Sequence, residues 1–287
     1  MNTLSRLRRY YDSNTRLFLG FGTGWRNASI HRPIWGEGVK ILQQAVHYSH
    51  RIFADELVNY YRNHQVDGVK VLDLGCGIGG SLFFLLENIP QIEKAWGISI
   101  SPKQVENARH INRLRGFEDR LWFMEADFHS LPPLDRVNLA FAIESFILSY
   151  DQHAFFEQSS RVIVENGLLI LVDDFLAEKT ATQPLKENQT AWIEEFKHGW
   201  LAHGLGRPTQ AVALAEQYGF KLKKQVDFSR QIRVNRLRDY WIAFLVSVTR
   251  PLRLRNSYLD NLSGGDALRK CIKNGITTYQ MLVFEKK

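Results

Sequence analysis

An acidic residue followed by a glycine-rich turn is the most chemically informative feature of the sequence. Asp73 ends an apolar run typical of a buried strand, and the turn Gly75–Gly80 follows it. Glycines let a backbone turn sharply and approach a ligand closely, because they carry no Cβ atom. A carboxylate at the end of a buried strand is costly unless a partner neutralises it. A cationic ligand amine would be such a partner.

The glycine spacing alone also fits the loop of a dinucleotide-binding protein. Two features argue against a nicotinamide-dependent oxidoreductase. The position of Asp73 is normally apolar in such a loop, and an acidic residue is expected about 20 residues further on, at the end of the second strand. Here that strand ends in Ser99 and Ser101.

The composition is that of an ordinary globular protein, with 45% hydrophobic and 23% charged residues. Its 287 residues suit one large domain or a domain with a sizeable insertion. No stretch approaches the ~18 apolar residues of a membrane span. The two cysteines, Cys76 and Cys271, give neither a disulfide framework nor a metal-site spacing. Since no signal-peptide segment is visible either, we expect a cytoplasmic protein without a metal site.

The formal net charge of +7 leaves three classes of partner open: nucleic acid, an anionic membrane surface or an anionic small molecule. The arginines are concentrated between residues 230 and 255, where aromatic residues are interleaved with them. The alternative is a solvated helix face. Because no nucleic-acid-binding module accompanies the charge, nucleic acid is the least favoured partner.

Short apolar strands alternate with helices from residue 69 onward, which predicts a doubly wound α/β sheet. The expected strands span residues 69–74, 94–100, 121–126, 137–143, 168–173, 220–228 and 277–285. Open sheets of this kind bind ligands at the carboxyl ends of their strands. The residues directly after each strand are therefore the site candidates.

The motifs resemble those of the class I S-adenosylmethionine-dependent methyltransferases. The segment 73–79 resembles the nucleotide-binding loop of that family, and the segment 164–169 resembles its turn before the fifth strand. The resemblance covers residues 69–176 and implies a Rossmann-like seven-stranded sheet that binds S-adenosylmethionine. It places Gly75, Cys76 and Gly77 around the cofactor, with the carboxylate of Asp73 facing the cofactor ammonium.

The segment 97–104 resembles the subgroup of cyclopropane-fatty-acid synthases, tocopherol methyltransferases and geranyl diphosphate C-methyltransferases. In that subgroup a small hydroxyl residue and a glutamine replace the usual ribose-binding acid, which assigns Ser99 and Gln104 to the ribose. Asp127 resembles the carboxylate that accepts a hydrogen bond from the adenine amino group, with Phe128 packed near the ring. The alternative for Asp127 is a helix cap after the third strand.

The N-terminal segment extends the resemblance. Tyr10-Tyr11-Asp12 resembles the subgroup's tyrosine-aspartate pair, which implies that Tyr11 closes over the methionine end of the cofactor. His31 begins a segment that resembles a histidine-aromatic motif, but Arg32-Pro33 departs from the pattern, where a glycine is more usual. His31 is therefore either catalytic or a structural histidine.

Methyl transfer from a sulfonium needs alignment in a dry pocket, and a base where the acceptor must lose a proton. Glu144 follows the fourth strand directly, and Ile143 before it is expected beside the cofactor. In the geranyl diphosphate enzymes a Glu-Ser pair at the matching place faces the reacting alkene, so Glu144 is the favoured base. The alternative is that Glu144 only orders the cofactor or a backbone amide. Tyr11 and His31 are the other catalytic candidates.

The resemblance also implies a division of the chain into an N-terminal helical segment over the cofactor (1–68), a cofactor-binding core (69–180), helical insertions with strand six (181–276) and a last strand (277–287). Residues 180–206 and 229–276 are expected to form a lid over the strand ends. Aromatic residues of this lid either grip an apolar substrate or are simply core: Trp192, Phe196, Trp200, Tyr240, Trp241 and Phe244. His198 and His203 share the lid.

The favoured function is C-methylation of an isoprenoid or prenyl diphosphate, because the arginine cluster suits a small apolar substrate with an anionic head. An O- or N-methyltransferase of a natural product is the first alternative, and a cofactor-binding scaffold without chemistry is the second. The sequence leaves open whether the lid makes a homo-oligomer.

Overall fold

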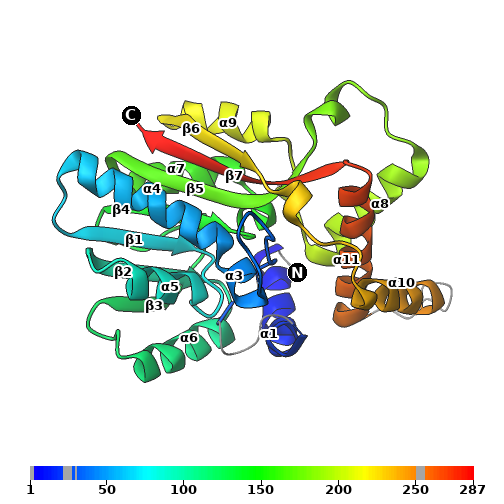
Figure 1. Cartoon of the computed structure of the whole chain (residues 1–287), viewed down its shortest axis with the longest axis horizontal. Helices are drawn as coiled ribbons and strands as arrows, with labels where there is room; N and C mark the ends of the chain where they lie inside the picture. The colour runs from blue at the N-terminus through cyan, green and yellow to red at the C-terminus, as the bar shows by residue number, and fades with distance from the viewer. Residues whose placement is uncertain (1–2, 22–27, 30, 250–255) are drawn as a thin grey trace.

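In the computed structural model, a seven-stranded sheet is covered by helices on both faces (Figure 1). The structure describes residues 3–21, 28–29, 31–249 and 256–287. The strands are β1 (Val69–Leu74), β2 (Ile92–Ser99), β3 (Leu121–Glu125), β4 (Val137–Ile143), β5 (Ile163–Leu176), β6 (Phe220–Asp227) and β7 (Thr277–Lys286). The α-helices are α1 (Thr3–Phe21), α3 (Leu42–Val46), α4 (Tyr48–His64), α5 (Gly80–Asn88), α6 (Pro102–Arg115), α7 (Gln152–Val162), α8 (Glu187–Trp200), α9 (Pro208–Gln217), α10 (Leu237–Thr249) and α11 (Ser257–Lys273).

The strand order is β3-β2-β1-β4-β5-β7-β6, with β1 to β5 parallel and β7 antiparallel to both of its neighbours. The chain winds outward through β2 and β3 on one side of β1 and through β4 and β5 on the other. The connections after β1 and β4 therefore diverge and leave a crevice at their carboxyl ends. The predicted doubly wound, seven-stranded sheet is confirmed.

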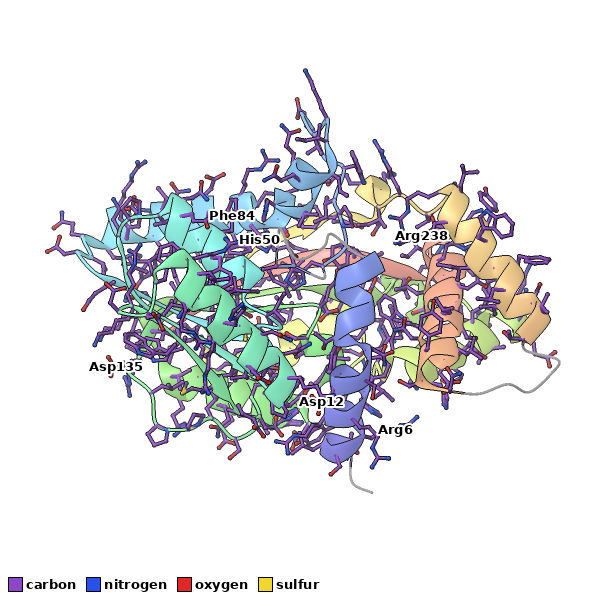
Figure 2. The ribbon with its side chains drawn as sticks, turned by 90° about the horizontal axis from the view of Figure 1, so that it is seen from below. Arg6, Asp12, His50, Phe84, Asp135 and Arg238 are labelled. Atoms are coloured by element: carbon purple, nitrogen blue, oxygen red, sulfur yellow. The ribbon has the colours of Figure 1, made fainter. Side chains whose placement is uncertain are left out.

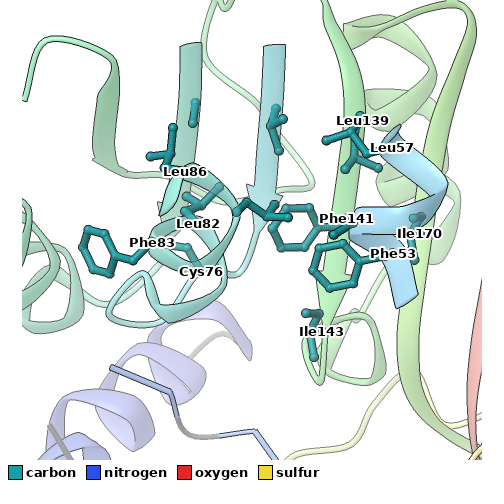
Figure 3. Packing of buried hydrophobic residues seen from close by; sticks show 14 of the residues in the cluster. Phe53, Leu57, Cys76, Leu82, Phe83, Leu86, Leu139, Phe141, Ile143 and Ile170 are labelled. Atoms are coloured by element: carbon teal, nitrogen blue, oxygen red, sulfur yellow. The ribbon is translucent and has the colours of Figure 1, made fainter. Parts of the chain in front are cut away.

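Two apolar layers sandwich the sheet, because alternate residues of each strand face opposite sides. On one face, strand residues such as Val71 pack against α4, α5 and α6. Phe53 of α4 stacks there on Phe141 of β4, with 5.1 Å between the ring centroids (Figure 3). On the other face, residues such as Leu72 pack against α7 and α9. Burial on both faces explains why the central strands are almost continuously apolar.

Strand β5 is longer than expected. It begins at Ile163, directly after α7, and not at residue 168. The expected turn at residues 165–167 lies inside this strand as a local distortion, where Asn166 has a φ of 61°. The register against β4 shifts at the same place.

Helices α8, α10 and α11, which we call the outer helices, lie beyond the ends of the central strands (Figure 1). Helices α8 and α11 cross very closely, because a Cβ atom on Gly199 would lie 2.2 Å from the Asp260 carbonyl oxygen and 2.7 Å from Cα of Gly264. Helix α10 exposes much of its apolar surface, including Trp241, which is 72% exposed. None of the helices in the described ranges is long and apolar enough to cross a membrane.

Candidate active site

A cavity of about 700 Å³ lies at the carboxyl ends of β1, β2, β4 and β5 and is bounded on its other sides by α1, α10 and α11. Most of the predicted site residues line it: Tyr11, His31, Gly75, Cys76, Gly77, Ser99, Gln104, Asp127, Phe128, Ile143 and Glu144. Asp73 differs, since it is buried within β1 and does not line the cavity.

The glycine turn has the backbone geometry that its residues predict. Gly75 and Gly77 have φ values of 106° and 54°, which favour glycine over residues with a side chain. A Cβ atom on Gly75 would lie 2.5 Å from the Ser145 Cβ atom. The amide of Cys76 donates to the Ile98 carbonyl at 2.8 Å, which fixes the turn against the end of β2. The turn therefore keeps bare backbone at the cavity wall.

Asp73 is a buried carboxyl group that receives no cation from the residues that the structure describes. Asp73 is 2% exposed, and burial raises the pKa of its carboxyl group well above the ordinary range. Within the described part of the chain, neither a hydrogen bond nor a positive charge offsets this effect. The site directly below the glycine turn thus favours a positively charged ligand group.

Ser99 and Gln104 form a fixed polar pair at the end of β2. The Ser99 hydroxyl donates to Oε1 of Gln104 at 2.7 Å, and Nε2 of Gln104 donates to the Thr15 hydroxyl of α1 at 3.3 Å. Ser101 caps α6, because the Gln104 amide donates to the Ser101 hydroxyl at 3.2 Å. Both members of the pair are buried, so their remaining hydrogen-bonding capacity faces the cavity that they line.

Helix α1 contacts both sides of the cavity. On one side the Ser101 hydroxyl donates to Asp12 at 2.6 Å. On the other side Nδ2 of Asn14 donates to the Ser257 hydroxyl of α11 at 2.7 Å. Tyr11 directly precedes Asp12 on α1 and lines the cavity, and burial raises the pKa of its hydroxyl group well above the ordinary range.

Asp127 follows β3 and accepts three hydrogen bonds. They come from the His129 amide at 2.9 Å, from Nδ1 of His129 at 2.7 Å and from the Tyr150 hydroxyl at 2.6 Å. Burial opposes ionisation, but the hydrogen bonds from His129 and Tyr150 outweigh it and lower the pKa of this carboxyl group. Asp127 caps no helix, because β3 continues into a turn that Asp127 bridges to Ser130. The ring of Phe128 packs edge-on against Phe155 at 5.3 Å.

Glu144 lies just past β4 in a conformation that is unusual for a side-chain-bearing residue, with a φ of 52°. Its Oε1 atom accepts from the Arg32 amide at 2.9 Å, from the Tyr279 hydroxyl at 2.9 Å and from Nε of Arg32 at 3.3 Å. Burial opposes ionisation, but the charge of Arg32 outweighs it and lowers the pKa of Glu144. Glu144 is therefore a firmly held anion.

The guanidinium of Arg32 also pairs with both carboxyl oxygens of Asp174, and it lies 4.2 Å from the ring centroid of Tyr279. Burial raises the pKa of Asp174 to about 6, although Arg32 opposes the shift. Its neighbour Asp173 accepts a hydrogen bond from the Ile147 amide at 2.9 Å, and burial raises the pKa of Asp173 well above the ordinary range. Sequence reasoning missed Asp173, Asp174 and Tyr279 as cavity or network residues. The two adjacent acids at the end of an apolar strand were the available signal.

His31 lines the cavity with one ring nitrogen bound and the other free. Its Nε2 atom lies 3.2 Å from the Ser81 hydroxyl, whereas Nδ1 is buried without a hydrogen-bond partner. Burial lowers the pKa of His31, although the charge of Glu144 opposes this shift. His31 is thus a neutral imidazole at neutral pH, with an unused lone pair.

The cavity wall carries charges of both signs. Five arginines and six carboxyl groups line it. Besides Arg32, Arg236 pairs with Asp239 at 3.2 Å and Arg269 pairs with Asp266 at 2.7 Å. Part of the arginine cluster considered above, at positions 250, 253 and 255, lies outside the described residues.

The outer helices contribute three of the expected aromatic residues to the cavity, namely Trp200, Trp241 and Phe244. The other three do not line it: Trp192, Phe196 and Tyr240. Phe196 is fully buried in a small core between α8 and α11. His198 and His203 do not line the cavity either.

Comparison with known proteins identifies the family. Residues 65–225, more than half of the chain, match a family described as a methyltransferase domain. The chain is a class I S-adenosylmethionine-dependent methyltransferase. Methyltransferase GfsG of Streptomyces halstedii is 34% identical to this methyltransferase over 231 residues, which cover 78% of this chain and 76% of that protein. A sterol 24-C-methyltransferase of Gibberella zeae is 23% identical over 82% of this chain and 57% of that protein.

The fold agrees with that assignment. A geranyl diphosphate methyltransferase solved with GPP and sinefungin superposes with a TM-score of 0.73 and 17% identity, over 99% of each chain. The cavity also fits the cofactor of the family. A bare glycine turn and a polar pair suited to a diol line it, and the buried carboxyl group of Asp73 lies in β1 just before the turn. The methyltransferase uses S-adenosylmethionine.

Proposed function

We propose that this methyltransferase methylates a hydroxyl oxygen of a small, largely apolar molecule. S-adenosylmethionine supplies the activated methyl group. The observation that carries the proposal is the contrast between two neighbouring groups at the cavity wall. His31 is neutral with an unpaired nitrogen, whereas Glu144 is an anion held by Arg32 and Tyr279.

The cofactor residues follow from the positions of the strand ends. We assign Asp73 to the ammonium group, because it is the buried carboxyl group without a cation. Ser99 and Gln104 suit the ribose, since a hydroxyl and an amide can both donate to and accept from a diol. Asp127 lies beside Phe128 at the end of β3 and suits the adenine amino group.

His31 is the better general base for a hydroxyl acceptor. A base works best with a pKa near the working pH, and it must be unprotonated at rest. Burial keeps His31 neutral, and the nearby charge of Glu144 stabilises the imidazolium that forms when His31 accepts a proton. A carboxylate with a lowered pKa, such as that of Glu144, is a weaker proton acceptor.

The wall of the cavity favours an uncharged acceptor. Two of the arginines that line the cavity pair with carboxyl groups of this chain, Arg236 with Asp239 and Arg269 with Asp266, and a third, Arg233, lies over the Trp35 ring. Binding a diphosphate there would require breaking partly buried ion pairs, which is costly. Aromatic side chains from the outer helices suit apolar contacts with the acceptor.

C-methylation of an isoprenoid is the second candidate. The rings of Tyr11, Trp200 and Tyr279 surround the region of Glu144, and aromatic faces stabilise cations such as an alkylated alkene. Relatives named sterol 24-C-methyltransferases add support for this candidate. In that reaction Glu144 would take the proton from the carbocation.

The test is to identify the methylated atom. The protein is incubated with S-adenosylmethionine carrying a 13C-methyl group and with a panel of macrolide and polyketide alcohols, sterols and geranyl diphosphate. Products are then analysed by mass spectrometry and 13C NMR. We expect methyl ethers of alcohols. Methyl groups on carbon, with alcohols unchanged, would contradict the proposal.

The base assignment is tested on the best acceptor of that panel. We expect His31→Asn to lower kcat by ~10²–10⁴-fold with little change in cofactor affinity, because only the proton acceptor is lost. The matched control is His64→Asn, since His64 is exposed on α4 and contacts only the Tyr60 carbonyl at 2.8 Å and the Tyr60 ring. Full activity of His31→Asn would exclude His31 as the base.

A further inference from the structure

Hydrogen-bonded side chains lead from the cavity to the surface of α4. The Ser81 hydroxyl of α5 lies 3.2 Å from Nε2 of His31 and 2.8 Å from Nε2 of His50. The other ring nitrogen of His50, Nδ1, lies 3.3 Å from Nδ1 of His47. His50 is fully buried, whereas His47 is half-buried at the N-terminus of α4. We call these four residues, His31, Ser81, His50 and His47, the histidine relay.

We propose that the histidine relay carries the proton released by the methyl acceptor from the cavity to solvent. This inference rests on the proposed function, because the proton comes from the acceptor hydroxyl and enters at His31. It adds three residues outside the cavity wall to the reaction.

The donors and acceptors of the relay can be arranged in one consistent direction. A hydroxyl that bridges two imidazoles donates to one and accepts from the other. With Nε2–H of His31 donating to Ser81, the Ser81 hydroxyl donates to Nε2 of His50. Nδ1–H of His50 then donates to Nδ1 of His47. This arrangement leaves Nδ1 of His31 as the free lone pair, which is the ring nitrogen that the structure leaves without a partner.

Proton transfer through this arrangement balances. Nδ1 of His31 has almost no accessible surface in this structure, so binding of the acceptor must first uncover it. The acceptor hydroxyl then loses its proton to Nδ1 of His31, and the Nε2 proton of His31 passes to Ser81. Ser81 passes its own proton to Nε2 of His50, and the Nδ1 proton of His50 moves to His47. His47 releases its Nε2 proton to water. Each relay group ends neutral, with each imidazole in its other tautomer, and one proton reaches water for each proton that the methyl group replaces on oxygen.

Aromatic packing holds the relay rings in place. Phe84 stacks on His47 with 4.7 Å between centroids, and its ring lies 5.5 Å from His50 (Figure 2). Phe53 contacts the His50 ring edge-on at 5.5 Å. Fixed rings favour transfer along one path, since each proton has to move only along a preformed hydrogen bond. Proton exchange with water must restore the starting tautomers before the next transfer.

The surroundings keep the relay neutral at rest. Burial lowers the pKa of each of the three histidines. The charges of Arg51 and Arg115 lower the pKa of His47 further, whereas the Val46 carbonyl raises that of His50 and Glu144 raises that of His31. The relay is a linear chain of hydrogen-bonded side chains. Among the described residues, no group of three or more His, Cys, Asp or Glu side chains is arranged to hold a metal ion.

The first test reads the hydrogen bonds without any reaction. In 15N-histidine NMR spectra of the protein with S-adenosylhomocysteine, we expect neutral histidines, with the proton of His50 on Nδ1. Ser81→Ala removes the bridge and should shift the Nε2 signals of both His31 and His50, whereas His64→Phe should move neither. Unchanged His31 and His50 signals in folded Ser81→Ala would overturn the relay.

The second test is a proton inventory, which measures how many protons move in the rate-limiting step. We expect the wild type to show a curved dependence of kcat on the D2O fraction, as several protons move together. Ser81→Ala and His47→Gln should make this dependence linear and lower kcat at least about tenfold, less than loss of the base itself. His64→Phe should leave both kcat and its curved dependence on the D2O fraction unchanged. The surface variant His47→Gln keeps the test valid if Ser81→Ala fails to fold.

The outcomes separate the relay from the proposed function. If the methyl label is on oxygen and His31→Asn is inactive, but folded Ser81→Ala and His47→Gln keep the curved dependence, the relay is wrong and the proposed function stands. If the label is on carbon, the proposed function fails and the relay, which draws its proton from the hydroxyl, fails with it.

Discussion

On the side of the cavity that we assign to the cofactor, the polar groups come from strand ends and are fixed by the backbone of the sheet. On the acceptor side they come from distant segments and are fixed by one another, as Arg32 is by Glu144 and Asp174. On the cofactor side, the described residues give the buried carboxyl group of Asp73 no cation, whereas on the acceptor side Arg32, Arg236 and Arg269 pair with carboxyl groups. The comparison suggests that charge selects the cofactor, and that shape and exclusion of water select the acceptor.

Arg32→Met should break the acceptor side most severely. It leaves Glu144 and Asp174 buried without their cation, and loss of one partner of a buried pair costs about 3–5 kcal/mol. In the variant, the folded-state pKa values of both acids would exceed their unfolded values. The folded state then binds more protons, so its stability falls as pH rises through that window.

Urea unfolding at about pH 5 and about pH 8 measures this effect, and we expect the larger loss at the higher pH. The matched control is Arg8→Met, because Arg8 and its partner Glu125 are 47% and 42% exposed. Such a surface pair contributes less than ~1 kcal/mol. Equal losses for the two variants would show that the acceptor side does not depend on its internal pairing.

Gly75→Ala should have the largest effect on the cofactor side. A methyl group there would meet Ser145 and would disfavour the backbone conformation of the turn. We expect affinity for S-adenosylhomocysteine, measured by calorimetry, to fall at least ~100-fold, or about 2.8 kcal/mol. Gly116→Ala is the control. Gly116 also has a positive φ, of 70°, but a Cβ atom added there would have no neighbour within 4 Å. This control variant should cost ~1 kcal/mol of stability and leave affinity unchanged.

Asp73→Asn should separate binding from stability. The ligand ammonium would lose a charge-assisted contact of about 1.5–3 kcal/mol, so affinity should fall about 10- to 100-fold. Without ligand, the buried carboxyl group of Asp73 has a folded-state pKa above its ordinary value of 3.8. The folded wild type therefore binds more protons than the unfolded chain, and the stability of the protein falls as pH rises above that value.

The asparagine variant should lack this slope and melt at a higher temperature than the wild type at neutral pH. Thermal unfolding of both proteins without ligand, at several pH values above 4, measures the difference. A lower melting temperature for Asp73→Asn throughout this range would mean that the carboxyl group already has a compensating partner.

Trp241→Ala should have the smallest effect and should be confined to the acceptor. Trp241 lines the cavity although it is 72% exposed. We expect KM for the acceptor to rise about fivefold, or ~1 kcal/mol, with stability changed by less than ~0.5 kcal/mol. Leu114→Ala is the control, because Leu114 is 74% exposed on α6 and does not line the cavity. A change in cofactor affinity with Trp241→Ala would contradict the division between the two sides.

The sequence predicted the two sides unequally. Strand positions and the glycine turn were readable, because each depends on a local pattern of apolar residues and glycines. Glu144 was readable as a residue after a strand, but its partner Arg32, 112 positions away, was not. The sequence showed Arg32 only as a departure from a motif, since a buried ion pair is defined by three-dimensional position. His50 and Ser81 belong to no local pattern, and only the packing of α4 on α5 brings them together.

Helix α1 connects the end of β2 with α11 on the opposite side of the cavity. It is bonded to Ser101, directly after β2, through Asp12 and to α11 through Asn14. We expect a nucleoside that enters beneath Tyr11 to shift this helix and to loosen α11 with it. Loading of the methyl donor would then be linked to admission of the acceptor, and we expect the two molecules to bind in a compulsory order, with the donor first.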